Sequence, residues 1–134
     1  MVDDAREFSI GIRVYIEDTD AGGIVYYINY LKFMERARTE FMRSLGYGKT
    51  AIFDEDGMFV VHSSNVQYRD SALLDDELVA TARPIKVGKT SIVFEQLVKR
   101  GDVLLCQGEV KIACVNRQSR SPQAMPTLMF CAII

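Results

Sequence analysis

One amphipathic helical stretch, placed among β-rich runs, constrains the fold of this chain more than any other feature. From about Tyr27 or Asn29 to Leu45, apolar residues recur three and four positions apart, which predicts a helix with one apolar face. Gly46 follows where a helix C-terminus favours a left-handed residue. The apolar stripe consists of Tyr30, Phe33, Met34, Ala37, Phe41, Met42 and Leu45. A helix with so broad a stripe needs a large apolar surface to cover it.

The rest of the chain is rich in β-branched and aromatic residues separated by short turns, which is typical of strands. One strand is predicted over residues 8–16, before the helix. After the helix every element is predicted to be a strand, over residues 59–68, 77–87, 90–99 and 103–116. We therefore predict an α+β fold, in which the helix lies against the concave face of a curled antiparallel sheet whose last four strands form a meander.

Length and charge restrict the classes of protein that this chain can be. Its 134 residues leave room for one hydrophobic core, so residues 1–134 are predicted to form a single domain. The 16 Lys and Arg residues against 18 Asp and Glu residues give a net charge of -2, which argues against a nucleic-acid-binding surface. An apolar tail over residues 128–134 is shorter than the ~20 residues that a membrane span requires.

The cysteines indicate a reducing compartment. The three are odd in number, and none belongs to a CxxC or CxxH pair. Cys106 and Cys114 fall on one predicted strand about 26 Å apart, too far for a disulfide, and are predicted to be core thiols. Because the acidic N-terminus also lacks the apolar run of a signal peptide, we predict a soluble, cytoplasmic protein. One histidine and dispersed cysteines supply no ligand set, so neither a metal nor another cofactor is predicted.

A sheet with one helix leaves unpaired edges and much apolar area in a chain of this size, which favours an oligomer. Val103, Leu104 and Leu105 follow one another without a polar residue, unlike the polar edge strand that a monomer would need.

The residues best suited to chemistry lie just before the predicted helix. Glu17, Asp18 and Asp20 fall within four positions, ahead of two glycines. Free N–H groups at a helix start stabilise a nearby carboxylate in its charged form, so that it could serve as a nucleophile or a base. The same N–H groups could stabilise an oxyanion, which fits acyl transfer. The alternative is that these residues only form a turn and an N-cap, and the residues taken alone favour that structural interpretation.

Residues 17–26, EDTDAGGIVY, and residues 30–38, YLKFMERAR, resemble the hot-dog-fold acyl-CoA thioesterases of the 4-hydroxybenzoyl-CoA thioesterase family. Within that family, the branch associated with the Tol-Pal envelope system is the most similar. The similarity continues through residues 59–61, 74–76, 88–91 and 124–126, and so spans nearly the whole chain. The resemblance implies a long central helix wrapped by an antiparallel sheet, and hydrolysis of acyl-CoA thioesters to a free acid and CoA.

The same resemblance implies roles for individual residues. The catalytic carboxylate falls on Asp20, as nucleophile or general base, and the backbone N–H that polarises the thioester carbonyl falls on Tyr27, which leaves Asp18 as a structural neighbour. The Tol-Pal-associated branch usually has His in place of Tyr27 and Tyr in place of Ile16, so these two residues are predicted to give the acyl group a drier wall. Gly23 and Val25 are the other predicted substrate contacts in this loop.

Basic residues near two predicted hairpin turns are candidate contacts for the phosphates of CoA. Lys86, Lys89, Lys99 and Arg100 are predicted to cluster there, although solvated hairpin ends explain them equally well. The resemblance favours Lys89 as the CoA contact. It also implies active sites between protomers, in a homodimer that could pair into a homotetramer.

Two other residues are candidates for general base. His62, the only histidine, has no Ser or Cys partner and is interpreted as a structural or pocket-wall residue. Glu35 lies on the helix, where Lys32 and Arg38 one turn away favour surface ion pairing over catalysis. A non-catalytic hot-dog module that docks an acyl carrier or an envelope protein is the alternative function.

Overall fold

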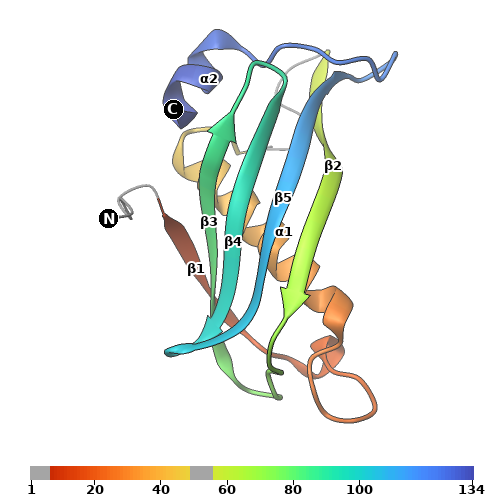
Figure 1. Ribbon diagram of the computed structural model, residues 1–134, viewed down its shortest axis with the longest axis vertical. Helices are drawn as coiled ribbons and strands as arrows, with labels where there is room; N and C mark the ends of the chain where they lie inside the picture. The colour runs from red at the N-terminus through yellow and green to blue at the C-terminus, as the bar shows by residue number, and fades with distance from the viewer. Residues whose placement is uncertain (1–6, 49–55) are drawn as a thin grey trace.

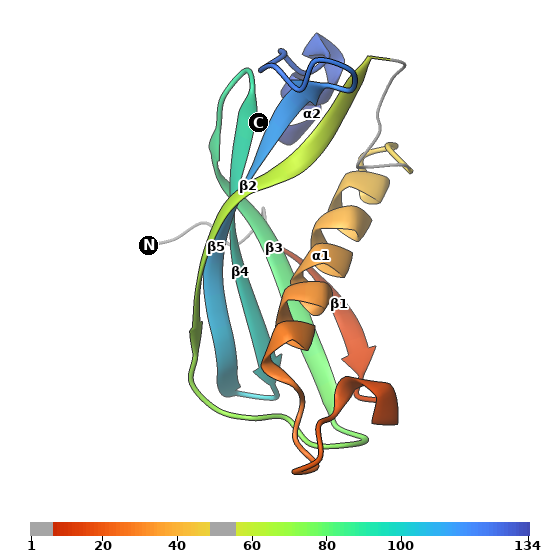
Figure 2. The same cartoon turned by 90° about the vertical axis from the view of Figure 1, so that its right-hand side faces the viewer.

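The computed structural model describes residues 7–48 and 56–134. They form a five-stranded antiparallel sheet of order β1-β3-β4-β5-β2, with α1 (Tyr27–Ser44) along one face (Figures 1 and 2). The strands are β1 (Phe8–Arg13), β2 (Gly57–Tyr68), β3 (Glu77–Val87), β4 (Ser91–Arg100) and β5 (Val103–Asn116). The predicted α+β arrangement of one long helix and an antiparallel sheet is confirmed.

The apolar stripe of α1 forms the centre of the core. Its residues from Tyr30 to Met42 are buried, and Leu45 packs partly buried against them. Opposite the helix, the inner face of the sheet contributes Leu78, Ile92 and Phe94, all at 1% exposure or less. Burying such side chains stabilises a domain by about 1.5–3 kcal/mol each. Gly46, with φ of +99°, ends the helix in the predicted left-handed conformation.

The position of β2 differs from the predicted four-strand meander. Only β3, β4 and β5 are consecutive neighbours, whereas β2 pairs with β5, with Gly57 opposite Asn116 and Tyr68 opposite Cys106. The connection over residues 69–76 therefore carries the chain from one side of the sheet to β3 (Figure 1). Alternation along a strand indicates which face is buried and leaves its neighbours undetermined, so the sequence pattern could not reveal this crossing.

The apolar run over residues 103–105 was predicted to favour an oligomer as an edge strand, and this prediction is wrong because the run does not form an edge. It begins β5, which lies between β4 and β2, and Leu105 is fully buried. Within the described part of the chain, β1 and β2 are the edge strands.

The first strand is shorter than predicted. β1 ends at Arg13, and Ile16–Asp18 forms a short 3₁₀ helix, η2. The Asp18 carboxylate accepts the Tyr15 N–H at 2.9 Å. Such local side-chain hydrogen bonds compete with strand pairing, and here they turn the chain away from the sheet.

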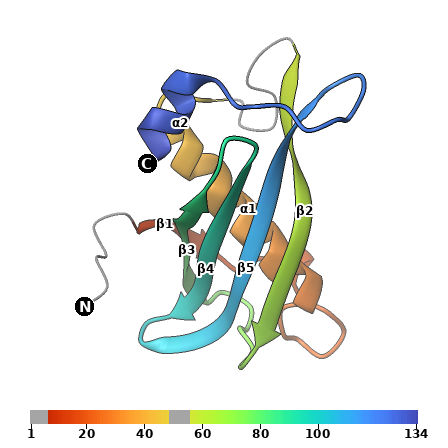
Figure 3. The ribbon, with the colours of Figure 1, turned by 45° about the horizontal axis from the view of Figure 1, so that its top comes forward.

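The prediction that only strands follow the long helix is also wrong. α2 (Thr127–Ile133) begins after Pro126 and buries Met129 and Ile133, which lie four residues apart. It lies at the end of the sheet where β3 turns into β4 (Figure 3). Seven residues are too few for periodicity to distinguish a helix from a buried strand. Neither of the helices described is long and apolar enough to cross a membrane.

Candidate active site

The Asp20 carboxylate lies exposed on a tight turn between η2 and α1. Its Oδ1 accepts the Gly22 N–H at 2.8 Å. A Cβ at position 22 would lie 3.2 Å from that oxygen and would push the carboxylate aside, and Gly23 has φ of +83°, which favours glycine. Among the residues that the structure describes, no cation or second donor contacts this carboxylate. Its other oxygen is therefore open to water or to a ligand.

The loop that carries Asp20 has two legs, residues 18–20 and 24–26, and hydrogen bonds between these legs close it. The Asp20 N–H donates to the carbonyl of Ile24 at 2.9 Å, and Thr19 bridges Val25. Val25 is buried, and its N–H donates to the carbonyl of Ala72 at 2.9 Å. The loop is thus a small closed hairpin held against the connection between β2 and β3, and Val25 anchors it to the core.

The first turn of α1 follows the second leg of this hairpin. The N-cap residue Tyr26 supplies no side-chain cap, and its own N–H donates to the carbonyl of Asp18 at 2.9 Å. Within the described chain, the Tyr27 N–H donates to no protein acceptor. Unpaired N–H groups at a helix start carry partial positive charge. The helix therefore presents a donor suited to an oxygen that gains negative charge.

Asp18 is held quite differently from Asp20. It is 5% exposed, its Oδ2 accepts the Tyr15 N–H at 2.9 Å, and its Oδ1 accepts Nδ2 of Asn29 at 2.8 Å. Both oxygens thus hold the chain together, as expected of a structural neighbour. Asn29 was not predicted to belong to the site, although an amide at the start of an apolar helical stripe was a usable signal.

The Tyr27 side chain belongs to a group of tyrosines beside the helix start. Its ring centroid lies 5.0 Å from that of Tyr26 and 5.8 Å from that of Tyr68, and the Tyr68 ring lies 5.9 Å from that of Tyr30. Edge-to-face arrangements of this kind stabilise aromatic pairs. Burial raises the pKa of both Tyr30 and Tyr68, so their hydroxyls stay protonated at neutral pH.

Ile16 has different surroundings from Tyr27. It is 76% exposed and borders an open groove. The other residues that line this groove are Arg13, Tyr15, Glu17, Leu74 and Asp75. Ile16 and Tyr27 therefore face different parts of the surface in one chain, and the structure does not bring them together in one wall.

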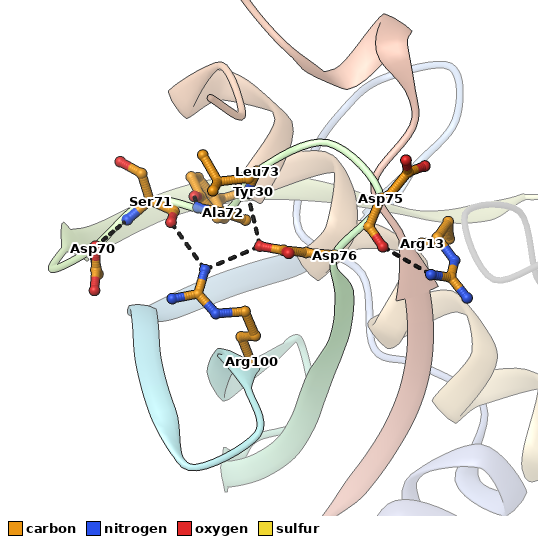
Figure 4. Close-up of polar contacts among 9 residues, drawn as sticks. All are labelled: Arg13, Tyr30, Asp70, Ser71, Ala72, Leu73, Asp75, Asp76 and Arg100. Carbon is orange, nitrogen blue, oxygen red and sulfur yellow. Dashed lines mark hydrogen bonds and ion pairs between the residues drawn. The ribbon is translucent and has the colours of Figure 1, made fainter. Parts of the chain in front are cut away.

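The connection between β2 and β3 contacts the Asp20 loop through its backbone, and side chains brace the connection itself (Figure 4). Asp76 Oδ2 accepts the Leu73 N–H at 2.9 Å and Nη1 of Arg100 at 3.0 Å. The backbone hydrogen bond from Leu73, followed by the hydrogen bond and charge of Arg100, lowers the pKa of Asp76. Leu73 in turn bridges Ile24, and the hydroxyl of Tyr30 accepts the Ala72 N–H at 3.0 Å. The loop and the helix start are both fastened to this network.

Lys89 lies at the other end of the sheet from the Asp20 loop. It is exposed in the turn between β3 and β4, and its carbonyl accepts the Met125 N–H at 2.9 Å. The ten residues of β4, about 30 Å at 3.3 Å per residue, separate this turn from Arg100. The predicted cluster of Lys86 and Lys89 with Lys99 and Arg100 is therefore wrong. Within one chain, Lys89 cannot share a site with Asp20.

Glu35 forms no ion pair within the described residues, so its predicted pairing with Lys32 or Arg38 is wrong. Its Oε1 accepts the Thr39 hydroxyl at 3.2 Å. Arg38 instead reaches the core, where Nη1 donates to Oε1 of Gln96 at 2.9 Å, and burial lowers its pKa.

His62 is exposed beside an irregularity in β2, with Nδ1 3.3 Å from the Ser63 hydroxyl. It contacts none of the loop residues that carry the candidate chemistry.

The end of this loop, from Gly22 onward, and the whole of α1 lie within a match to a known family. Residues 22–107 match the model of the Thioesterase superfamily, well over half of the 134 residues. The chain belongs to the thioesterase superfamily. A relative in this family, the acyl-CoA thioesterase YbgC of Haemophilus influenzae, is 42% identical over 120 residues, which cover 89% of this chain and 88% of that protein.

Solved structures of thioesterases share this fold. A probable thioesterase from Bartonella henselae superposes with a TM-score of 0.80 at 30% identity, covering 90% of this chain and 99% of that one. The 1,4-dihydroxy-2-naphthoyl-CoA thioesterase Slr0204 from Synechocystis superposes with a TM-score of 0.87 at 18% identity, covering 95% of each chain, which shows the fold alone. The predicted hot-dog fold and the resemblance to hot-dog thioesterases are confirmed.

Proposed function

We propose that this protein hydrolyses acyl-CoA thioesters to a free acid and CoA, with Asp20 and the Tyr27 N–H acting on the thioester. The observation that carries the proposal is the pairing of an open carboxylate with an uncapped helix start on the two legs of one closed loop. Membership of the thioesterase superfamily supports it, and so does the 42% identity to an acyl-CoA thioesterase.

Two chemical routes fit this arrangement. In one, Asp20 attacks the thioester carbonyl, the CoA thiolate leaves, and water then hydrolyses the mixed anhydride. In the other, Asp20 takes a proton from water, which attacks the carbonyl directly. In both, the carbonyl oxygen becomes negative and accepts the Tyr27 N–H. After a single turnover in water labelled with ¹⁸O, label in Asp20 establishes the nucleophilic route, because only attack of water on the Asp20 carbonyl of the anhydride places it there.

The acyl group is expected to be medium-chain or aromatic. Ile16 and the half-exposed ring of Tyr27 offer exposed apolar surface in the segments before and after Asp20, and such an acyl group would pack on it. Each buried methylene contributes about 0.8 kcal/mol, or a factor of about four in affinity. Gly23 keeps the backbone beside Asp20 open to the substrate.

The direct test is thiol release from acetyl-, hexanoyl-, octanoyl- and benzoyl-CoA. We expect turnover, with the longer or aromatic substrates giving a higher kcat/KM than acetyl-CoA. Acetyl-CoA as the best substrate would contradict the expected preference for apolar acyl groups. Binding without release of thiol from any substrate would instead favour the non-catalytic module.

We infer that a second copy of the chain completes the site. β2 has 12 residues, and no strand pairs with its outer edge in the described part of the chain. A long open edge is an interface for another strand, and a twofold axis would pair two β2 edges antiparallel.

Because this twofold rotation reverses the strand direction, the partner's turn between β3 and β4 would lie toward the Asp20 loop. Lys89 of the partner subunit could then bind the phosphates of CoA. The outer sheet face would remain available for pairing of dimers into a tetramer.

Mixing two inactive variants tests this assembly. Asp20→Asn and Lys89→Glu are each expected to be impaired as homodimers. A mixed dimer would regain one complete site, so mixing should restore turnover. No restoration, or a fully active monomer by light scattering, would contradict the shared site.

The compartment is proposed to be the cytoplasm. Cys106 and Cys114 are buried free thiols on β5, as predicted, and Cys131 is an exposed free thiol. Free thiols persist in reducing compartments.

A further inference from the structure

We propose that the buried pair of Asp18 and Asn29 is a positioning device, which holds the Asp20 carboxylate and the Tyr27 N–H in register with one thioester. The inference rests on the proposed function and adds to it two residues that contact no substrate. Asp18 lies two positions before Asp20, and Asn29 lies two positions after Tyr27. Their hydrogen bond of 2.8 Å therefore joins the segments that carry the reactive groups.

Asp18 accepts hydrogen bonds from three donors. Its side chain accepts from the Tyr15 N–H and from Nδ2 of Asn29, and its carbonyl accepts the Tyr26 N–H. These contacts join the start of η2, the N-cap of α1 and the first turn of α1. Asp18 and Asn29 are 5% and 6% exposed, so water cannot readily replace a lost contact.

The geometry demands a carboxylate at position 18. Both carboxylate oxygens of Asp18 accept hydrogen bonds, one from the Tyr15 N–H and one from Nδ2 of Asn29. An amide in its place would point its own NH₂ group at one of these two donors. An exchange of the two residues would repair the pattern. The amide placed at position 18 would then accept the Tyr15 N–H through its oxygen and donate from its nitrogen to the carboxylate placed at position 29, with the number of buried charges unchanged. A displacement near 1 Å in a catalytic site can lower turnover by about 100-fold.

The experiment measures kcat and KM separately for Asp18→Asn, Asn29→Asp, Asn29→Ala and the double exchange, with hexanoyl-CoA and benzoyl-CoA. Each single variant should lower kcat about 10- to 100-fold while KM changes less than about threefold. The double exchange should recover most of the lost kcat. Asn29→Ala removes the hydrogen bond to Asp18 without adding a buried charge. Its kcat therefore tests the proposal even if Asn29→Asp fails to fold.

The matched control is Thr81→Val. The buried Thr81 hydroxyl accepts the Leu97 N–H at 2.9 Å, remote from the loop, so its loss should lower thermal stability and leave kcat unchanged. Single variants that lose stability but keep kcat would overturn the proposal, as would a double exchange no better than its parents. Failure of the wild-type protein to release thiol would instead reject the proposed function.

Discussion

Two neighbouring segments of the molecule each carry three carboxylates but use them differently. In the connection over residues 69–76, Asp76 is held by the Leu73 N–H and by Arg100. In the loop before α1, Asp20 accepts a single N–H from Gly22 and faces solvent beside the start of a helix. Whether a carboxylate is available for chemistry therefore depends on the partners that the fold provides and not on the local density of acidic residues.

Replacement of the open carboxylate should have the largest effect. Asp20→Asn keeps the size of the side chain and can still accept the Gly22 N–H, but it removes the charge needed by a nucleophile or a base. We expect turnover to fall about 1,000-fold with thermal stability nearly unchanged. Asp102→Asn, which alters an exposed carboxylate in the turn between β4 and β5, is the control. A greater loss of turnover in Asp18→Asn would show that Asp18, and not Asp20, is the catalytic carboxylate.

Removal of the helix-start donor should have the next largest effect. Proline is tolerated at the first position of a helix, and Tyr26 already has φ of -65° and ψ of 132°, which suits a residue before proline. Tyr27→Pro should therefore keep the helix but lower kcat about 100-fold relative to Tyr27→Ala. Tyr27→Phe keeps the N–H and should lose less than about threefold. A large loss in Tyr27→Phe would show that the hydroxyl matters.

The paired carboxylate should affect stability and not catalysis. Asp76→Asn removes the charge that Arg100 contacts at 3.0 Å. The free energy of unfolding should fall by about 1–3 kcal/mol. The folded enzyme should keep its kcat, because the backbone contacts of Ala72 and Leu73 with the Asp20 loop do not involve the Asp76 side chain. Denaturant unfolding and initial rates on the same samples test this. An Asp76→Asn protein with wild-type stability but low kcat would show that Asp76 serves catalysis and not stability.

The pH dependence of stability should sharpen the same contrast. Because the folded state lowers the pKa of Asp76 below its ordinary 3.8, the stabilisation by this carboxylate is fully present above that pH. It is lost as pH falls through the lowered value. The stability difference between wild type and Asp76→Asn should therefore shrink on acidification. A difference that stays constant down to the lowest accessible pH would show that the charge of Asp76 contributes nothing.

Much of the fold could be predicted because periodicity reports burial directly. The stripe from Tyr30 to Met42 and the left-handed Gly46 define α1 to within a residue or two. The order of the strands could not be read in the same way, because β2 pairs with β5 through contacts between residues far apart in the sequence. The helix at Thr127–Ile133 was missed because seven residues carry too little periodicity.

The candidate site, like the fold, could be predicted from the sequence only in part. The sequence by itself determined the acidic and glycine-rich loop, the start of the long helix beside it and the family to which both belong, since these are local patterns. Only the tertiary structure decided which carboxylate is engaged and which is open, that Asn29 closes on Asp18, and that Lys89 lies at the far end of the sheet. The physical reason is that hydrogen-bond partners and burial arise from contacts between distant segments, and no local pattern specifies them.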